Sequence, residues 1–286
     1  MDWLTDQITD HKIPIGQWGK AFFDLLTTYL YWFFDGISLG IENSLEAVID
    51  GMLWIPPLIL VALIVALSFL LHRNWKLSIG VALGLLFIIN QGYWDETIQT
   101  LALVLGATFV SLAIGIPVGI AAAHRPWLFQ AIRPILDLMQ TLPTFVYLIP
   151  ALVLFGLGLA PGLIATVIFA IAAPIRLTHL GVTSVPRTLI EAGEAFGATK
   201  QQLLWKVELP HAMPTIMAGL TQCIMLSLSM VVIAALVGAD GLGKPVVRAL
   251  NSVNVPMGLE SGLAIVIVAI VLDRMFRSET TSWGGK

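Results

Sequence analysis

A polar segment, EAGEAFGATKQQLLWKVELP at residues 191 to 210, interrupts a chain that is 57% hydrophobic and 12% charged. Pro186 ends the element before it, and residues 188 to 196 are then predicted to form a short helix. Gly197 stops that helix, because glycine tolerates the left-handed conformation at a helix C-terminus. The side chains that flank the turn are small, so another protein can approach the backbone closely, while glutamates and lysines keep the rest in water.

A second short helix is predicted directly after this turn. Thr199 and Gln202 have the spacing of a capping box, and Pro210 is expected to close the helix. The pattern therefore predicts a helix, a sharp turn and a helix outside the bilayer. An ordinary cytoplasmic loop is the alternative interpretation, and a DNA-reading helix-turn-helix is disfavoured because a single turn with balanced charge lies between apolar stretches.

Glycines and histidines elsewhere in the chain carry weak signals. Gly238, Gly243 and Lys244 give G-x-x-x-x-G-K, but Pro245 replaces the Ser or Thr that holds magnesium in a P-loop, and an apolar helix precedes it where a P-loop needs a strand.

The histidines have no paired metal-ligand spacing, so no metal site is predicted. Interfacial snorkelling explains four of them. The five are His11, His72, His124, His179 and His211.

Long apolar runs predict a membrane protein of helices. A soluble domain carries about 25% charged residues, twice the share found here, and the mean hydropathy is +0.89. A span needs about 20 apolar residues, and the runs do not alternate as barrel strands do. The fold class is therefore all-α, a polytopic transmembrane bundle of about seven spans. They are expected near residues 55–72, 77–92, 98–123, 135–159, 162–182, 213–237 and 257–273.

Positive charge is distributed unequally between the two sides of these spans. One side has Arg73, Lys76, Arg125, Arg133, Arg176, Arg187, Lys200, Lys206, Arg274, Arg277 and Lys286. The other has only Lys12, Lys20, Lys244 and Arg248. The positive-inside rule then predicts an external N-terminus, a cytoplasmic C-terminus and a cytoplasmic polar segment. The net charge of −3 favours no nucleic-acid partner.

Ionisable groups within the spans are scarce. Asp137 and Arg176 are the main ones, and both can lie near the cytoplasmic face. An ion-coupled carrier or a channel needs a buried ion site at mid-membrane, and none is evident. An intramembrane enzyme is disfavoured too, because Cys223, Ser227 and Ser229 have no His or carboxylate partner at similar depth. The energy for any transport must therefore come from elsewhere.

The fourth predicted span holds a polar and aromatic cluster. Its prolines can kink the helix, and its aromatic rings offer faces to a quaternary ammonium ion. We expect some of these residues to line a translocation path or its gate, with simple helix packing as the alternative. The candidates are Thr141, Thr144, Phe145 and Tyr147.

The N-terminal tail, before the first span, is amphipathic. Trp18, Phe22 and Tyr29 recur at helical spacing, and Ile41 and Leu45 belong to a second such stripe beside carboxylates. Two amphipathic helices on the outer interface, or against a neighbouring subunit, are predicted. An extra packing element without a role in transport is the alternative.

Four parts of the chain resemble one transporter family. Glu191-Ala192, Gly197 six residues after the glutamate, and Leu209-Pro210 twelve beyond the glycine resemble the EAA loop of ABC importer permeases. Val207 stands where the motif usually has isoleucine, and Gly193 where it has alanine. The stretches 142–158 and 228–250 are similar to the glycine betaine, proline betaine and choline branch, and HKIPIG at 11–16 resembles the choline-type permeases.

The resemblance implies the MetI-like fold of type I ABC importers and a permease that catalyses no covalent chemistry. It implies that the polar segment is a coupling helix seated in a cytoplasmic ATPase, present in two copies, which binds the ATP and magnesium. A second permease copy, an external substrate-binding protein and the inner-membrane bilayer are the other expected partners. The substrate expected is choline or glycine betaine. The coupling residues carried over are Glu191, Ala192, Gly193, Gly197, Val207, Leu209 and Pro210.

The chain is accordingly divided into four parts. Residues 1–54 are the external amphipathic tail and 55–97 the first two spans. Residues 98–275 form the core permease domain, with the coupling loop at 187–212, and 276–286 form a cytoplasmic tail.

Overall fold

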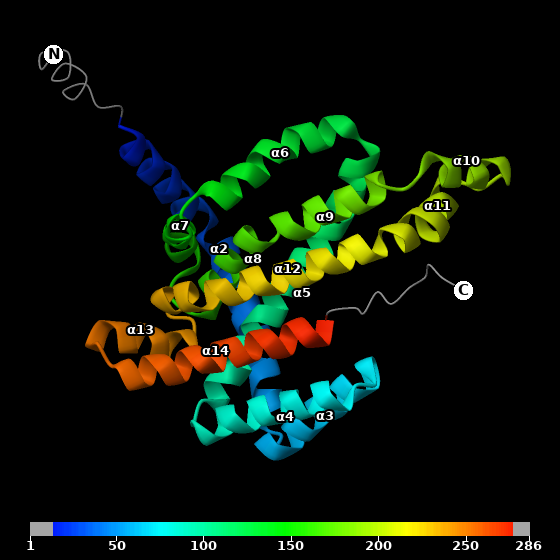
Figure 1. The fold of residues 1–286 in the computed structure, drawn as a ribbon. Coiled ribbons are helices and arrows are strands. Elements are labelled where there is room, and N and C mark those ends of the chain that lie inside the picture. Colours follow the sequence, from blue (N-terminus) through cyan, green and yellow to red (C-terminus); the bar gives the residue numbers. More distant parts are fainter. Residues whose placement is uncertain (1–13, 277–286) are drawn as a thin grey trace, which may run out of the picture.

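The computed structural model describes residues 14–276, and every regular element in that range is a helix (Figure 1). The longer helices are α2 Ile15–Leu53, α3 Pro57–His72, α4 Trp75–Asn90, α5 Trp94–His124, α6 Pro126–Thr141, α12 Leu209–Ala234 and α14 Val255–Phe276. The shorter ones are α7 Phe145–Phe155, α8 Leu159–Ala170, α9 Ala172–Thr183, α10 Arg187–Ala195, α11 Lys200–Leu203, η1 Leu204–Glu208, η2 Ala235–Val237 and α13 Gly243–Ser252. The predicted all-helical class is confirmed.

Helices α5, α8, α9 and α12 form the centre of the bundle (Figure 1). Small residues let their backbones approach closely, as is usual in membranes, where no hydrophobic effect drives helices together. A Cβ atom added to Gly119 of α5 would lie 2.8 Å from the carbonyl oxygen of Ile175 in α9. One added to Gly181 of α9 would lie 3.1 Å from the carbonyl oxygen of Ala212 in α12. These glycines therefore set the spacing of the helices on either side of the polar loop 187–212.

The number of full-length spans is smaller than the seven predicted. Four helical stretches are long and apolar enough to cross a bilayer, namely Trp94–His124, Leu159–Thr183, Lys200–Val237 and Val255–Phe276. Two bent pairs, α2 with α3 and α6 with α7, raise the number to six if each is one span. Helix α4 is apolar but has only 16 residues, fewer than the roughly 20 that a perpendicular span needs.

The fourth predicted span, 135–159, is wrong as a single helix. Helices α6 and α7 meet at 100°. Leu142 has extended backbone angles, φ −64° and ψ 138°, because the ring of Pro143 disfavours the helical conformation of the residue before it. Gly156, at φ +78°, ends α7. The apolar run is thus divided at its proline, and its two halves run in different directions.

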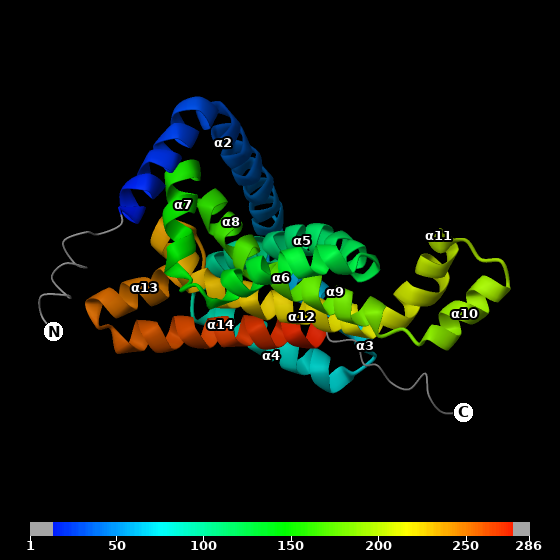
Figure 2. The same cartoon turned by 90° about the horizontal axis from the view of Figure 1, so that it is seen from above.

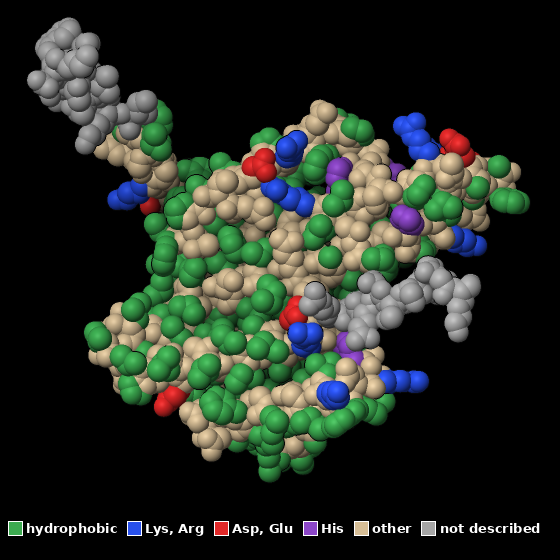
Figure 3. Space-filling model, viewed as in Figure 1, with side chains coloured by type: hydrophobic (Ala, Val, Ile, Leu, Met, Phe, Trp, Pro, Cys, Tyr) green, Lys and Arg blue, Asp and Glu red, His purple; other side chains and the backbone are tan. Residues whose placement is uncertain are grey.

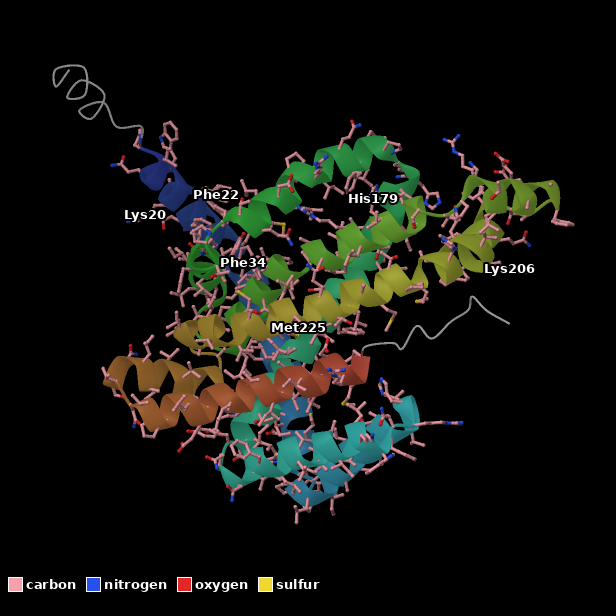
Figure 4. All side chains as sticks on the ribbon, viewed as in Figure 1. Lys20, Phe22, Phe34, His179, Lys206 and Met225 are labelled. Atoms are coloured by element: carbon pink, nitrogen blue, oxygen red, sulfur yellow. The ribbon has the colours of Figure 1, made fainter. Side chains whose placement is uncertain are left out.

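The predicted pair of N-terminal helices is present as the two arms of α2, which meet at a kink. Helix α2 runs from Ile15 to Leu53, and Leu30 has the non-helical angles φ −118° and ψ 15° (Figure 2). The arm after the kink contacts the bundle, where the ring of Phe34 lies 5.4 Å from that of Phe155 in an edge-to-face arrangement. Trp18 is exposed on the arm before the kink, and so is Phe22 (labelled in Figure 4). The residues HKI of the HKIPIG motif lie outside the described range.

The loops predicted on one side of the membrane gather at one end of the molecule. Helices α10 and α11, the turn between α3 and α4, and the C-terminal end of α14 lie together, and α13 lies at the opposite end (Figure 1). Lysine and arginine side chains are visible at the first of these ends (Figure 3). These positively charged segments, which are far apart in the sequence, thus lie toward one end of the molecule.

We expect Gly243→Ala to destabilise the fold. The new Cβ would lie 2.4 Å from the carbonyl oxygen of Val231, a backbone atom that cannot move aside. Overpacking of this kind costs about 1–3 kcal/mol. Thermal unfolding in detergent should show a lower Tm, with Gly262→Ala as the control, because nothing lies within 4 Å of that position. An unchanged Tm for Gly243→Ala would show that this close approach is not part of the native packing.

Candidate functional site

The turn at the end of α10 is a Schellman motif. The Ala198 N–H donates to the Gly193 carbonyl at 3.1 Å, and the Gly197 N–H donates to the Glu194 carbonyl at 2.8 Å. These are the two bonds that define the motif, with Gly197 as the left-handed residue at φ +77°. No heavy atom lies within 4 Å of a Cβ placed there. Gly197 is thus required by its backbone conformation and not by crowding within this chain.

The second helix begins with the predicted capping box. The Thr199 N–H donates to Gln202 Oε1 at 2.9 Å, and the Gln202 N–H donates to Thr199 Oγ1 at 3.3 Å. The predicted end of this helix at Pro210 is wrong. Pro210 lies in the first turn of α12, and the helical path continues through it from Lys200 to Val237.

A π-helical turn, η1, joins the loop to α12. It spans Leu204–Glu208, and Lys206 lies on it (Figure 4). Such turns insert an extra residue into a helix and occur often at functional sites. The sequence shows no signal for it, since its residues are ordinary helix formers. The turn rotates the faces of the helix, so that Glu208 faces the protein.

The predicted coupling residues divide into a surface and a base. Glu191, Ala192, Gly197 and Pro210 are exposed, whereas Leu209 is buried. The remaining two, Gly193 and Val207, lie between the two arms: a Cβ on Gly193 would lie 2.5 Å from Leu203 Cδ2 and 3.8 Å from Val207 Cγ2. Gly193 therefore lets the first helix rest directly on the buried Leu203 of the second.

Two aromatic residues that the motif does not include are exposed on the projecting loop. Phe196 is 93% exposed at the turn, and Trp205 is 66% exposed on η1. The loop extends beyond the end of the bundle in both views (Figures 1 and 2). Aromatic residues are enriched at protein–protein interfaces, so these two exposed side chains make the projecting loop a candidate protein-binding surface.

A buried carboxylate connects this loop to α5. Glu208 is 8% exposed, and its Oε2 lies 2.9 Å from Nε2 of His124, the last residue of α5. Nδ1 of His124 lies 2.9 Å from the Ile120 carbonyl oxygen. Both ring nitrogens of His124 thus lie within hydrogen-bond distance of an oxygen atom. Interfacial snorkelling is therefore the wrong explanation for His124, which forms part of the base of the loop.

The four candidate path residues lie around the bend between α6 and α7. Tyr147 is buried, and its hydroxyl donates to the carbonyl of Met139, so it holds the corner closed. Phe145 is 58% exposed, Thr144 is half-buried at the start of α7, and Thr141 is exposed at the end of α6. Only some of the cluster is therefore free to meet a solute, and its place in translocation stays a prediction.

The chain is similar to proteins of a known family. Residues 115–276 match the profile of the family described as binding-protein-dependent transport system inner membrane component. The chain is 47% identical to the glycine betaine transport system permease protein OpuAB of Bacillus subtilis, over 92% of this chain and 93% of that protein. The chain belongs to this permease family.

Two further permeases and one structure support the assignment. The glycine betaine/carnitine transport permease protein GbuB of Listeria monocytogenes is 43% identical, over 92% of this chain and 94% of its own. The glycine betaine/proline betaine permease protein ProW of Escherichia coli is 40% identical, over 96% and 81%. The MetNI methionine ABC transporter, in an inward-facing conformation, matches with a TM-score of 0.56 and 25% identity over 61% of this chain and 88% of that chain. The fold is therefore MetI-like.

The permease carries two further contacts that sequence reasoning did not pair. Arg176 of α9 donates to Asp137 of α6 at 2.6 Å, so the two main ionisable groups of the spans neutralise one another. One turn further along α9, the ring of His179 stacks on Phe129 of α6, with centroids 3.6 Å apart (Figure 4). Snorkelling is thus the wrong explanation for His179 too. Both contacts fix α6 against the centre of the permease.

The glycine-rich loop of the permease is a packing element. Gly241, at φ +124°, lies against α5, where the Leu242 N–H donates to Thr100 Oγ1 at 2.9 Å. Lys244, the lysine of the G-x-x-x-x-G-K pattern, forms an ion pair with Asp240. The loop connects η2 to α13, so no strand precedes it.

Proposed function

We propose that this permease moves glycine betaine or a closely related quaternary-ammonium osmolyte into the cytoplasm. The names of the three relatives above support the proposal, because each contains glycine betaine and none contains choline. Their similarity extends over nearly the whole chain, including the stretches 142–158 and 228–250 on which the resemblance rests. Choline, carnitine and proline betaine are the competing substrates to test.

We propose that residues 187–212 are the coupling loop that seats in a cytoplasmic ATPase. The observation that carries this is the projecting loop itself, with an exposed tip at Phe196 and a base fixed by Glu208 and His124. A rigid projection can transmit a displacement to the spans, whereas a mobile one would absorb it. Two ATPase copies would hold the ATP and magnesium, so this chain needs no cofactor of its own.

The proposed assembly has two permease copies and an external binding protein. The distribution of lysine and arginine supports an external N-terminus and a cytoplasmic C-terminus. In this arrangement residues 1–54 are an external tail, 55–97 the first spans, 98–275 the core, and 276–286 a cytoplasmic tail. ATP binding would draw the coupling loops together and shift the spans from inward-open to outward-open.

We propose that the α6–α7 corner borders the translocation path and that Phe145 meets the substrate. Cation–π contact with a quaternary ammonium contributes about 0.5–2 kcal/mol, so Phe145→Leu should raise the KM for uptake about two- to thirtyfold. Phe145→Tyr keeps the ring and should preserve the KM. Uptake at graded substrate concentrations measures the effect, and equal KM values for all three proteins would remove Phe145 from the path.

The decisive experiment is uptake into vesicles that contain the permease, its ATPase and its binding protein. Labelled glycine betaine should accumulate only with ATP and in preference to labelled choline. Vesicles without ATP, but with an imposed proton or sodium gradient, test the alternative of an ion-coupled carrier. Accumulation that follows the gradient and ignores ATP would contradict the importer proposal, whereas ATP-driven uptake of choline alone would contradict only the substrate.

A further inference from the structure

A groove of about 270 Å³ runs between α4 and α14, away from the coupling loop and from the α6–α7 corner. Gly80 and Gly84 form its α4 wall, and Ile267 and Ile270 form its α14 wall. The first turn of α4 lies beside the last turn of α14, so the two helices are antiparallel. Its walls are therefore almost entirely apolar over two helical turns.

The groove exists because glycines replace side chains on α4. Nothing lies within 4 Å of a Cβ placed on Gly80, whereas at Gly84 the side chain of Ile267 already lies 2.7 Å away. The groove is thus open at Gly80 and narrow at Gly84. Its apolar walls offer a water molecule no hydrogen-bond partners. In the hydrocarbon region of a bilayer, an apolar chain is therefore the occupant that fits the groove.

Positive charge lies at one end of the groove. Lys76 of α4 and Arg274 of α14 both line it, and both are exposed. Within residues 14–276 neither has a carboxylate within ion-pair distance. The neighbouring Asp273 is not among the lining residues. Lysine and arginine are visible at this end of α4 and α14 in the space-filling view (Figure 3).

We propose that this groove binds an anionic phospholipid, with one acyl chain between α4 and α14 and the phosphate between Lys76 and Arg274. The helix rises about 12 Å over the eight steps from Lys76 to Gly84, which is room for the upper part of an acyl chain. Two cations that have no ion-pair partner among residues 14–276 complement a lipid of net negative charge, whereas the amine of a zwitterionic lipid would be repelled. The inference goes beyond the proposed transport function. In the proposed orientation the bound lipid belongs to the cytoplasmic leaflet, and this point alone depends on that orientation.

The test measures lipid retained by the purified permease. The protein in detergent is titrated with phosphatidylglycerol or phosphatidylcholine, and bound lipid is counted by native mass spectrometry. Each cation near a membrane surface changes the affinity for an anionic lipid about fivefold, so the Lys76→Gln/Arg274→Gln variant should bind phosphatidylglycerol roughly 25-fold more weakly. Binding of phosphatidylcholine should barely change. Arg125→Gln, which removes an exposed cation outside the groove, should behave as the wild type.

A second variant tests the groove itself. Gly80→Leu adds a side chain where the structure has open space, so it should exclude the acyl chain without disturbing the helix contact at Gly84. Phosphatidylglycerol binding should fall although both cations remain, and glycerophosphate, which lacks acyl chains, should not compete. Unchanged lipid binding in either variant would overturn the proposal. If glycerophosphate competes as well as the lipid does, the groove binds only the phosphate group. If the variants lose permease dimers and keep their bound lipid, the groove is a protein interface.

Discussion

Replacing Gly197 with valine should abolish most ATP-driven uptake while leaving the permease folded in the membrane. An L-residue in the left-handed region is disfavoured by about 1–2 kcal/mol, and β-branched side chains are the least tolerant. The Schellman bonds from Gly197 and Ala198 would be lost, and the tip at Phe196 would point elsewhere. We expect uptake to fall by at least about tenfold, measured in the reconstituted vesicles, with an unchanged Tm.

Asparagine and alanine at the same position separate two explanations for that loss. Asparagine adopts the left-handed conformation more readily than alanine, although it is larger. If the conformation of the turn is what matters, Gly197→Asn should keep more uptake than Gly197→Ala. The reverse order would mean that the side chain collides with the ATPase, because the permease itself has nothing within 4 Å of that position. Full activity of Gly197→Val would remove the turn from the coupling mechanism.

Local features of the sequence predicted the turn of the loop and two of the long apolar helices well. Capping at Thr199 and the left-handed glycine at 197 depend on neighbouring residues, so their spacing alone carries the information. The predicted spans 162–182 and 257–273 lie within Leu159–Thr183 and Val255–Phe276 for the same reason. A long apolar helix is recognisable without knowing its neighbours.

Directions of helices were harder to predict than their positions. Hydropathy averages over about 19 residues, so the apolar run 135–159 gives one continuous signal although Pro143 divides it. The backbone of Leu142 shows where the path turns by 100°. A proline can kink, end or merely begin a helix, and Pro210 does the last of these. Only the packing of the surrounding helices decides among the three outcomes.

Contacts between distant segments were missed altogether. His124 and Glu208 are 84 positions apart, and Asp137 and Arg176 are 39 apart. Asp137 and Arg176 stood out in the sequence as ionisable groups, but nothing there indicated that they pair. The contact between Glu208 and His124 depends on the close approach of α5, α9 and α12, which the glycines at 119 and 181 allow, and the other pair depends on how α6 lies against α9. One sequence without relatives gives no sign of it.

The contact between Glu208 and His124 has a consequence for coupling. The loop continues covalently into α12 through η1, but its only hydrogen-bonded connection to α5 in the described part of the chain is this pair. A displacement of the loop would therefore reach α12 through the backbone and α5 through the carboxylate. Losing the pair should weaken the transmission of the movement to α5. The ATPase should still bind the permease and hydrolyse ATP.

We expect Glu208→Ala to uncouple ATP hydrolysis from transport. Hydrogen bonds that involve a charged group contribute about 1.5–3 kcal/mol, and the half-exposed imidazole reduces this to roughly 1 kcal/mol here. Uptake per ATP hydrolysed should then fall about fivefold, with hydrolysis itself largely preserved. Simultaneous measurement of phosphate release and labelled uptake in the same vesicles gives the ratio.

A double-mutant cycle decides whether the pair acts as a unit. His124→Ala should lower the ratio as much as Glu208→Ala does, and the double variant should be no worse than either, because each single change already removes the contact. Glu208→Gln retains an acceptor for the imidazole and should recover part of the ratio. Glu46→Ala, which removes an exposed carboxylate from α2, controls for a general effect of charge. Additive losses in the double variant would mean that the two residues act separately, and that α5 receives the movement of the loop through packing alone.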